Sequence, residues 1–316
     1  MGDVTIIIPT LRRLESLERA LRSVFAQTGV GERVGSIVVV DNDPRASARD
    51  LVEYLSAVSP WPLVYRHAAQ PGVATARNAG LAATGAALIA FLDDDEAASP
   101  EWLSHLLGGQ VETGADVVFG PIAGRAPGAA PWLTPYLEAF FGRSGPTTTG
   151  LIDTPYGCGN SLMVRAVALP GVEPFDTGAD QAGGEDDALF AALKGRGGRF
   201  GWAADAWVYE FAPPHRATLT YALSRAFAYG QGPSQTAAAT RNWPGVIRWM
   251  LIGAAQTVVW GSASAVLFAM RSPRRAEMYD RTARGLGKVF WMKGFEPHFY
   301  GAREVERLDR VSPSGG

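Results

Sequence analysis

Four short apolar runs alternate with helical patterns over the first 92 residues. The predicted strands are residues 4–9, 37–40, 63–65 and 87–92, and the predicted helices between them are residues 14–27, 46–56 and 73–84. Continuous runs of Val, Ile and Leu are typical of parallel strands that are buried on both faces. Repeated strand–helix units of this size therefore predict an α/β fold, with a doubly wound, mainly parallel sheet flanked by helices.

Acidic residues follow two of these strands directly. Asp41 comes after the second strand, and Asp93, Asp94, Asp95 and Glu96 come after the fourth. Ligands of doubly wound sheets bind at the carboxyl ends of the strands, so these residues mark a candidate site. Adjacent aspartates repel one another unless a cation or hydrogen-bond donors compensate. A solvated turn that caps the next helix is the alternative, but the position after a buried strand favours a hard cation.

The common phosphate-binding motifs are missing from the sequence. The sequence has no GxGxxG motif after the first predicted strand and no GxxxxGK[ST] motif. These glycine-rich loops hold phosphates with backbone N–H groups. If this site binds phosphate groups, a cation held by the aspartates would therefore have to bind them.

Charge is distributed unevenly along the chain. Residues 241–316 carry 12 Lys+Arg and 6 Asp+Glu, whereas residues 1–240 carry 17 and 25, and the total of the 316 residues is −2. This balance argues against a nucleic-acid partner. Cys158 is the single cysteine, which excludes an intramolecular disulfide and fits a reducing compartment. The N-terminal residues lack the pattern of a signal peptide, so we expect the body to stay in the cytoplasm.

The second half contains three further patterns. Residues 121–157 are rich in Gly, Pro and Thr, and form either a loop over the site or an insertion packed on the sheet. The run YGCGN at 156–160 leads into a predicted strand at 161–165, and its glycines suit either close approach of a ligand or a bulge. The run GGEDD at 183–187 precedes a predicted helix at 188–194, where acidic residues are favourable for the helix dipole alone.

Several of these runs together resemble family 2 glycosyltransferases of the GT-A fold. The similar segments are TIIIPTLRR, VVVDNDP, QPGVATARNAGLAATGAALIAFLDDDE and GEDDALFAALKGRGGRFGW, and the resemblance spans residues 3–230. It implies inverting transfer of a sugar, a hexose or an N-acetylhexosamine, from a nucleotide-sugar, usually UDP-linked, with Mg²⁺ or Mn²⁺. The implied acceptor is a hydroxyl of a saccharide or polyprenyl-linked saccharide in polysaccharide biosynthesis.

The resemblance also implies roles for individual residues. It places nucleotide binding on Pro9, Thr10, Arg12, Asp41, Arg77, Asn78 and Asp93. It places the metal on Asp95, and the donor sugar or acceptor beside Asp94, Gly159 and Asn160. The Glu-Asp motif falls on Glu185 and Asp186, with Asp186 as general base and Asp187 as the alternative. Where relatives have a histidine that completes the metal site, this chain offers Glu210 or His215. Arg77 also fits an ordinary helix surface, and Asn78 a helix cap.

The C-terminal part has a different character. Residues 249–270 contain no charged side chain, and arginines flank them at 241, 248, 271, 274 and 275. This length fits a spanning helix, a buried core helix, or a helix lying on a membrane with both basic flanks facing anionic lipids. We favour the last, and expect a catalytic domain at 1–240 and a membrane-associating helical appendage at 241–316. The expected location is the cytoplasmic face of the inner membrane, with a cytoplasmic protein as the alternative.

Two other functions fit the same fold. A catalytically inactive nucleotide-sugar-binding module would have little reason to keep both Asp95 and Asp186. A nucleotidyltransferase usually has a glycine-rich, basic loop after its first strand, whereas this chain has Pro-Thr-Leu-Arg-Arg at 9–13. Both observations favour the glycosyltransferase.

Overall fold

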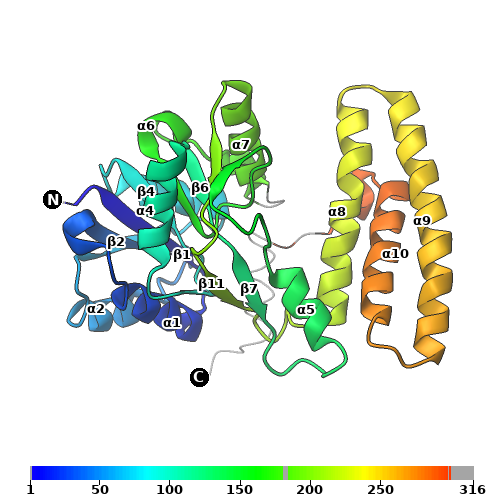
Figure 1. Cartoon of the computed structure of the whole chain (residues 1–316), viewed down its shortest axis with the longest axis horizontal. Coiled ribbons are helices and arrows are strands. Elements are labelled where there is room, and N and C mark those ends of the chain that lie inside the picture. The colour runs from blue at the N-terminus through cyan, green and yellow to red at the C-terminus, as the bar shows by residue number, and fades with distance from the viewer. Residues whose placement is uncertain (1, 181–183, 298, 300–316) are drawn as a thin grey trace. The chain divides into compact units, whose positions relative to one another are not determined.

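The computed structural model describes residues 2–180, 184–297 and 299. Its contacts divide the chain into two compact units (Figure 1). The first unit contains the chain up to residue 123 and residues 143–211, and the second contains residues 124–142 and 212–297.

An eight-stranded sheet forms the centre of the first unit, in the order β3-β2-β1-β4-β9-β6-β10-β8. Its strands are β1 (Val4–Thr10), β2 (Val34–Asp41), β3 (Leu63–His67), β4 (Leu88–Phe91), β6 (Val117–Phe119), β8 (Gly150–Ile152), β9 (Ser161–Val164) and β10 (Phe200–Trp202). The first four are parallel, whereas β9 runs antiparallel to both β4 and β6. The doubly wound, mainly parallel sheet expected from the sequence is confirmed in this half.

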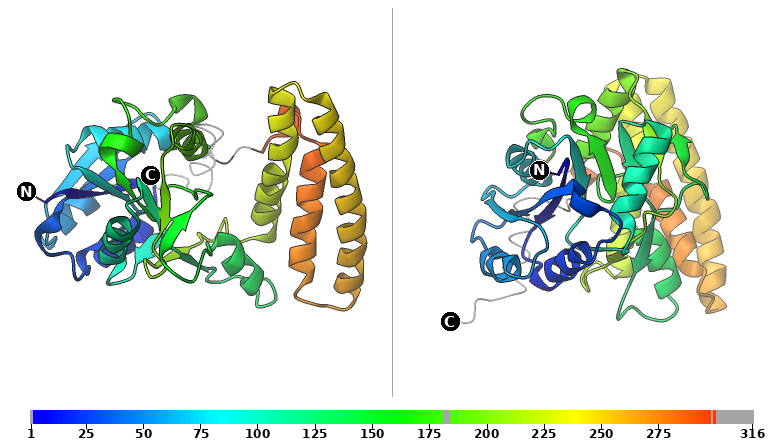
Figure 2. Two further views of the ribbon diagram at one scale, coloured as in Figure 1. Left: turned by 45° about the horizontal axis from the view of Figure 1, so that its top comes forward. Right: turned by 60° about the vertical axis from the view of Figure 1, so that its left-hand side comes forward.

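Helices cover both faces of the sheet because successive strand residues point to opposite sides. Ile6 and Ile8 pack with α1 (Leu14–Phe25), α2 (Arg49–Ser56) and α4 (Trp102–Thr113), whereas Ile7 packs with α3 (Val73–Ala82) and α7 (Glu185–Gly195). Figure 2 shows the sheet between these helices. Every residue of β1 except Pro9 is buried, which explains why its sequence is mostly apolar.

A second sheet has three strands in the order β5-β11-β7, namely β5 (Glu96–Ala98), β11 (Val208–Phe211) and β7 (Ile122–Arg125). The segment 143–152 is not a loop over the site, since β8 pairs with β10 and Pro146 O accepts from Trp202 Nε1. The shorter helical elements are α6 (Arg165–Ala168), η1 (Gly31–Arg33), η2 (Thr177–Ala179) and η3 (Lys293–Phe295).

The second unit is helical, with α5 (Thr134–Phe141), α8 (Leu219–Ala239), α9 (Trp243–Ala269) and α10 (Arg275–Val289). Helix α10 lies between α8 and α9 (Figures 1 and 2). Glycines allow this close packing: a Cβ at Gly253 of α9 would lie 2.6 Å from the Gly285 carbonyl oxygen of α10. The unit includes α8, so it begins before residue 241. A functional division at 240/241 stays a prediction.

Helix α7 differs from its predicted start at residue 188. It starts at Glu185, so the acidic run forms its first turn instead of preceding it. Helix α8 tolerates Pro233 within it.

Candidate active site

The ends of β1 and β2 lie side by side, with Pro9 paired to Val40 and Thr10 paired to Asp41. Asp41 is fully buried, and its carboxylate accepts hydrogen bonds from the backbone N–H groups of Asp43 (3.0 Å) and Ala48 (2.8 Å) and from the hydroxyl of Tyr65 (3.0 Å). The structure thus gives Asp41 a role in folding the loop after β2. Its predicted contact with a nucleoside stays a prediction.

The loop after β1 holds the aspartates that follow β4. The Thr10 hydroxyl donates to Asp94 Oδ2 (2.8 Å). One nitrogen of Arg13, Nη1, lies 2.8 Å from Asp94 Oδ1 and 2.9 Å from Asp95 Oδ2. Burial raises the pKa of Asp94, and Arg13 partly offsets this. Arg13 was not among the predicted site residues, and only its position after a strand end could have indicated it.

The neighbouring arginine has a different partner. Arg12 has a left-handed backbone (φ 54°), and its Nη2 lies 2.9 Å from Asp43 Oδ1. Burial raises the pKa of Asp43, but hydrogen bonds from Arg12 and from the Arg45 backbone N–H outweigh it and leave the pKa below its usual value. Arg12 therefore connects the loops after β1 and β2. Whether it also binds a phosphate stays a prediction.

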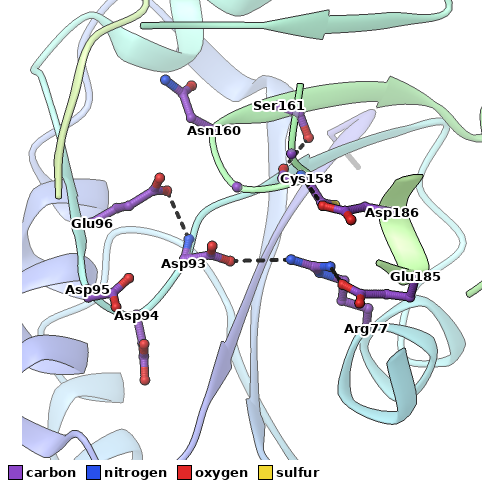
Figure 3. Close-up of polar contacts among 12 residues, drawn as sticks. Arg77, Asp93, Asp94, Asp95, Glu96, Cys158, Asn160, Ser161, Glu185 and Asp186 are labelled. Carbon is purple, nitrogen blue, oxygen red and sulfur yellow. Dashed lines mark hydrogen bonds and ion pairs between the residues drawn. The ribbon is translucent and has the colours of Figure 1, made fainter. Parts of the chain in front are cut away.

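Arg77 on α3 joins two acidic segments (Figure 3). Its Nη1 donates to Glu185 Oε1, and its Nη2 lies 3.7 Å from Asp93 Oδ1. Burial by itself lowers the pKa of Arg77, but the surrounding negative groups, Asp93 and Glu185 among them, raise it above its ordinary value. The guanidinium is thus a permanent buried cation, and not the helix-surface charge that was the alternative. Its Nε has no hydrogen-bond partner within the described part of the chain.

The Glu-Asp motif occupies the first turn of α7, and its residues differ in environment. Glu185 is buried against Arg77, Asp186 is half-buried, and Asp187 is exposed. Asp186 Oδ2 accepts the backbone N–H of Cys158 (3.0 Å), which places this carboxylate beside the 156–160 segment. Burial raises the pKa of the Cys158 thiol, so Cys158 is a packed side chain and not a nucleophile.

The segment 157–160 runs directly past Asp93. A Cβ at Gly159 would lie 2.6 Å from Asp93 Oδ2, so any larger residue here would force the Asp93 carboxylate to shift. Arg143 fixes this segment, since its guanidinium donates to the carbonyl oxygens of Gly159 (2.9 Å) and Gly157 (3.0 Å). Arg143 was not predicted, because it lies in a Gly/Pro-rich stretch that carries no motif.

Asn160 corrects one sequence assignment. It is fully buried, its Oδ1 accepts from Trp102 Nε1 (2.7 Å), and its Nδ2 donates to the carbonyl oxygens of Pro121 (2.8 Å) and Ala206 (3.0 Å). These bonds occupy the amide, so Asn160 positions the start of β9 instead of contacting a sugar.

Two more side chains shape the N-terminal part of α3. Asn78 bonds both backbone groups of Phe175, through Nδ2 (2.8 Å) and Oδ1 (3.1 Å). Asp180 accepts from the backbone N–H groups of Ala74 (2.8 Å) and Thr75 (3.1 Å) at the helix N-terminus. Asn78 is thus not a local helix cap, and its predicted contact with a nucleotide stays a prediction. Asp180 gave no signal in the sequence, since its partners are about a hundred residues away.

The remaining candidates concern a metal ion. Glu210 lies opposite Glu96 in the β5–β11 pair. Burial and the charges of Asp93 and Glu210 raise the pKa of Glu96 well above its ordinary value, and its Oε2 accepts the Asp93 N–H (3.0 Å). His215 belongs to the second unit. The described residues include no group of three or more His, Cys, Asp or Glu placed to hold a metal.

The loop that follows β4 and contains Asp93, Asp94 and Asp95, here called the aspartate loop, nevertheless suits a cation. The Arg13 guanidinium already bridges Asp94 and Asp95, so positive charge is stable there. Mg²⁺ commonly takes only one or two protein carboxylates and completes its shell with phosphate oxygens and water. The donor set therefore fits a divalent ion that binds together with a diphosphate.

Comparison with known proteins identifies the family. The model of glycosyl transferase family 2 matches residues 5–169. The succinoglycan biosynthesis protein ExoM of Rhizobium meliloti (strain 1021) is 34% identical over 307 residues, which cover 96% of this chain and 97% of that protein. The pre-mycofactocin glycosyltransferase of Mycobacterium tuberculosis (strain ATCC 25618 / H37Rv) is 25% identical over 89% of this chain and 58% of its own length.

A solved structure has a similar fold. The crystal structure of S. aureus TarS 1–349 superposes with a TM-score of 0.55 at 16% identity, and the match covers 95% of this chain and 99% of that one. The family match spans more than half of the present chain, and it includes the strand ends and aspartate loop described above. The chain belongs to glycosyl transferase family 2 and is a glycosyltransferase of the GT-A fold.

Proposed function

We propose that this glycosyltransferase moves a hexose or N-acetylhexosamine from a UDP-linked donor to a hydroxyl of a saccharide or polyprenyl-linked saccharide, with inversion. The name of the relative ExoM supports a role in polysaccharide biosynthesis. The TarS fragment has also been solved in complex with UDP, which supports a uridine nucleotide as donor.

The metal assignment rests on the aspartate loop. Asp95 would hold Mg²⁺ or Mn²⁺, and a structural neighbour, GalNAc-T7, was crystallised with UDP, GalNAc and Mn²⁺. A divalent ion stabilises the negative charge that develops on a departing diphosphate. Glu210 and His215 stay candidates for a further ligand.

Asp186 is the proposed general base, and its position carries the proposal. An acceptor hydroxyl is a poor nucleophile, so a carboxylate must take its proton as the new bond forms. Asp186 is half-buried, it accepts the Cys158 N–H at 3.0 Å, and its neighbour Glu185 connects through Arg77 to Asp93. The base is thus tied to the loop that binds the donor. Asp187, one residue on, is exposed and lacks these connections to Arg77 and Cys158 among the bonds of the described residues.

Two residues shape the donor subsite. Arg77 places a buried positive charge beside Asp93, and Gly159 lets the backbone run close to that carboxylate. We assign Thr10 and Arg13 to orienting the aspartates, since Thr10 donates to Asp94 and Arg13 donates to both Asp94 and Asp95. Fixed groups of this kind stabilise charge in the transition state without having to reorganise.

The proposed reaction takes place at the cytoplasmic face of the inner membrane. In the part of the chain that the structure describes, one helix, Trp243–Ala269, is long and apolar enough to cross a membrane. A lipid-linked acceptor would be reached most readily by an enzyme held at that surface.

The test is a panel of nucleotide-sugars with Mn²⁺ or Mg²⁺, scored for release of nucleoside diphosphate with and without candidate acceptors. Asp186→Asn should abolish transfer, by on the order of 10²–10⁴-fold, while UDP binding measured by calorimetry is unchanged. Asp187→Asn is the matched control and should retain near-normal turnover. Near-normal transfer by Asp186→Asn would remove the assignment. Tight nucleotide binding without transfer from any donor would instead favour the inactive binding module.

A further inference from the structure

Helix α9 leaves one face without a partner inside its unit. Its buried residues are Val246, Gly253 and Ser264, all on the side that faces α10. The residues on the opposite side recur every three or four positions, and all of them are exposed. They are Ile247, Leu251, Ala254, Val258, Ser262, Ala265 and Ala269. Val258 and Leu251 are 69% and 66% exposed. Apolar side chains on this face do not stabilise the helix while they remain in water. An exposed face of this kind is typical of a surface that binds a partner.

The charge around this face has one sign. No acidic residue occurs between Glu210 and Glu277, whereas seven arginines do. Four of them flank α9, at positions 241, 271, 274 and 275, and Arg248 lies in its second turn. Trp243 and Met270 are exposed at its two ends. Aromatic and basic residues at the ends of an apolar face are typical of helices that lie in the interface of an anionic membrane.

Helix α10 decides how α9 can lie. The two helices pack at close range through Gly253 and Gly285, so they move together. At mid-length, the Arg281 guanidinium lies 4.6 Å from the centre of the Trp260 ring, and Arg281 is exposed. A spanning α9 would carry this arginine into the hydrocarbon, where a charge costs several kcal/mol or more. A helix lying in the membrane plane keeps α10 on the water side.

We propose that the exposed face of α9 is an in-plane docking surface for an anionic lipid bilayer, and that α9 does not span it. The apolar side chains insert to the boundary of headgroups and acyl chains, about 5–10 Å deep, and the flanking arginines contact anionic headgroups. This inference deepens the location given under the proposed function, on which it rests only for the choice of membrane. Of the three alternatives that the sequence left open for this segment, it favours the surface-lying helix.

The first experiment is flotation of the purified full-length protein with vesicles of phosphatidylcholine alone or of equal parts phosphatidylcholine and phosphatidylglycerol. The protein should float with the anionic vesicles, and high salt should weaken this binding. Leu251→Asp/Val258→Asp should reduce flotation at least about tenfold, because two apolar side chains that would be buried in the bilayer are each replaced by a charged one. Val58→Asp/Val111→Asp, at exposed valines of the first unit, is the matched control and should float normally.

The second experiment separates lying from spanning. A membrane-impermeant maleimide is added to vesicle-bound Val258→Cys or Arg281→Cys, with the parent protein as blank because Cys158 is buried. Arg281→Cys, at mid-length on the α10 side, should react fully and Val258→Cys should be protected at least several-fold. Protection of both overturns the in-plane arrangement, and reaction of both shows that another surface binds the lipid. A soluble dimer that Leu251→Asp/Val258→Asp dissociates, without flotation, would assign the face to a second copy and overturn the proposal.

Release of nucleoside diphosphate from the donor in solution is measured alongside. The α9 double variant should turn over the donor normally, so lost flotation with retained turnover isolates docking. Normal flotation of a protein that transfers no sugar would leave the docking surface intact and reject the proposed function.

Discussion

The buried Arg77 guanidinium donates to the Glu185 carboxylate and lies 3.7 Å from Asp93, so one cation connects the first turn of α7 with the loop after β4. Asp186 follows Glu185 directly and bonds the Cys158 N–H. The proposed base is therefore held in place by its neighbour's ion pair. This makes Glu185 a positioning residue, although the sequence motif alone groups it with the catalytic ones.

Glu185→Gln should damage both stability and chemistry. The substitution removes the nearer of the two carboxylates that pair with Arg77 and leaves Asp93 at 3.7 Å, and breaking a buried ion pair in this way costs about 3–5 kcal/mol of unfolding free energy. Chemical denaturation measures that loss. We expect kcat to fall more than donor KM rises, because Asp186 moves while the nucleotide contacts remain. Asp187→Asn, on the same turn but exposed, should change stability by less than about 0.5 kcal/mol. Wild-type stability and turnover in Glu185→Gln would contradict the positioning role.

The sheet and its edge could be predicted because they depend on local patterns. The apolar runs, their stop at Asp41 or Asp93, and the alternation of Ile6 and Ile7 between two faces are properties of short segments. These patterns were sufficient to place the aspartate loop beside the end of β1.

Arg13, Arg143 and Asp180 could not be predicted in the same way. Each acts on a segment distant in the sequence or on backbone groups, and no periodicity or motif marks such a pairing. Asn160 shows the converse. Its motif position suggested a ligand contact, but three long-range hydrogen bonds use its amide. Where a polar side chain finds its partner depends on tertiary packing, which the sequence pattern does not contain.

Gly159→Ala should impair catalysis while the protein stays folded. The added Cβ would lie 2.6 Å from Asp93 Oδ2, so the carboxylate must shift. A displacement of about 1 Å at reacting groups can cost on the order of 10²-fold in rate. Steady-state kinetics should show a lower kcat/KM, and the thermal midpoint should stay close to wild type. Gly150→Ala, where no atom lies within 4 Å of an added Cβ, is the control. Equal kinetics for the two variants would show that Asp93 is not fixed by this contact.

Arg13→Gln should strengthen Mn²⁺ binding. In the structure Arg13 supplies the positive charge between Asp94 and Asp95 that a divalent ion would otherwise provide. Removing that charge should tighten Mn²⁺ binding in the presence of UDP about tenfold, since one unit charge at this range is worth on the order of 1–2 kcal/mol after screening. Electron paramagnetic resonance of free Mn²⁺ gives the affinity directly. Arg13→Lys keeps the charge and should bind like wild type. Weaker binding by Arg13→Gln would instead place Arg13 on the diphosphate.

Asp43→Asn should remove one component of the acid sensitivity of folding. Burial raises the pKa of Asp43, but Arg12 and the Arg45 N–H outweigh it, so the folded-state pKa lies below the usual 3.8. At pH values between 3.8 and the folded-state pKa, the unfolded chain binds more protons than the folded chain. Stability therefore falls as the pH decreases through this window. The contribution is fully present above that window.

The difference in unfolding free energy between wild type and Asp43→Asn should therefore shrink as the pH is lowered through this window. Urea unfolding over a pH series measures it. When both proteins also carry Arg12→Gln, Asp43→Asn should change the unfolding free energy less at neutral pH as well. The Arg12–Asp43 ion pair at 2.9 Å is then absent from both proteins being compared. A difference that stays constant with pH would show that the Arg12–Asp43 pair does not hold the two loops together in solution.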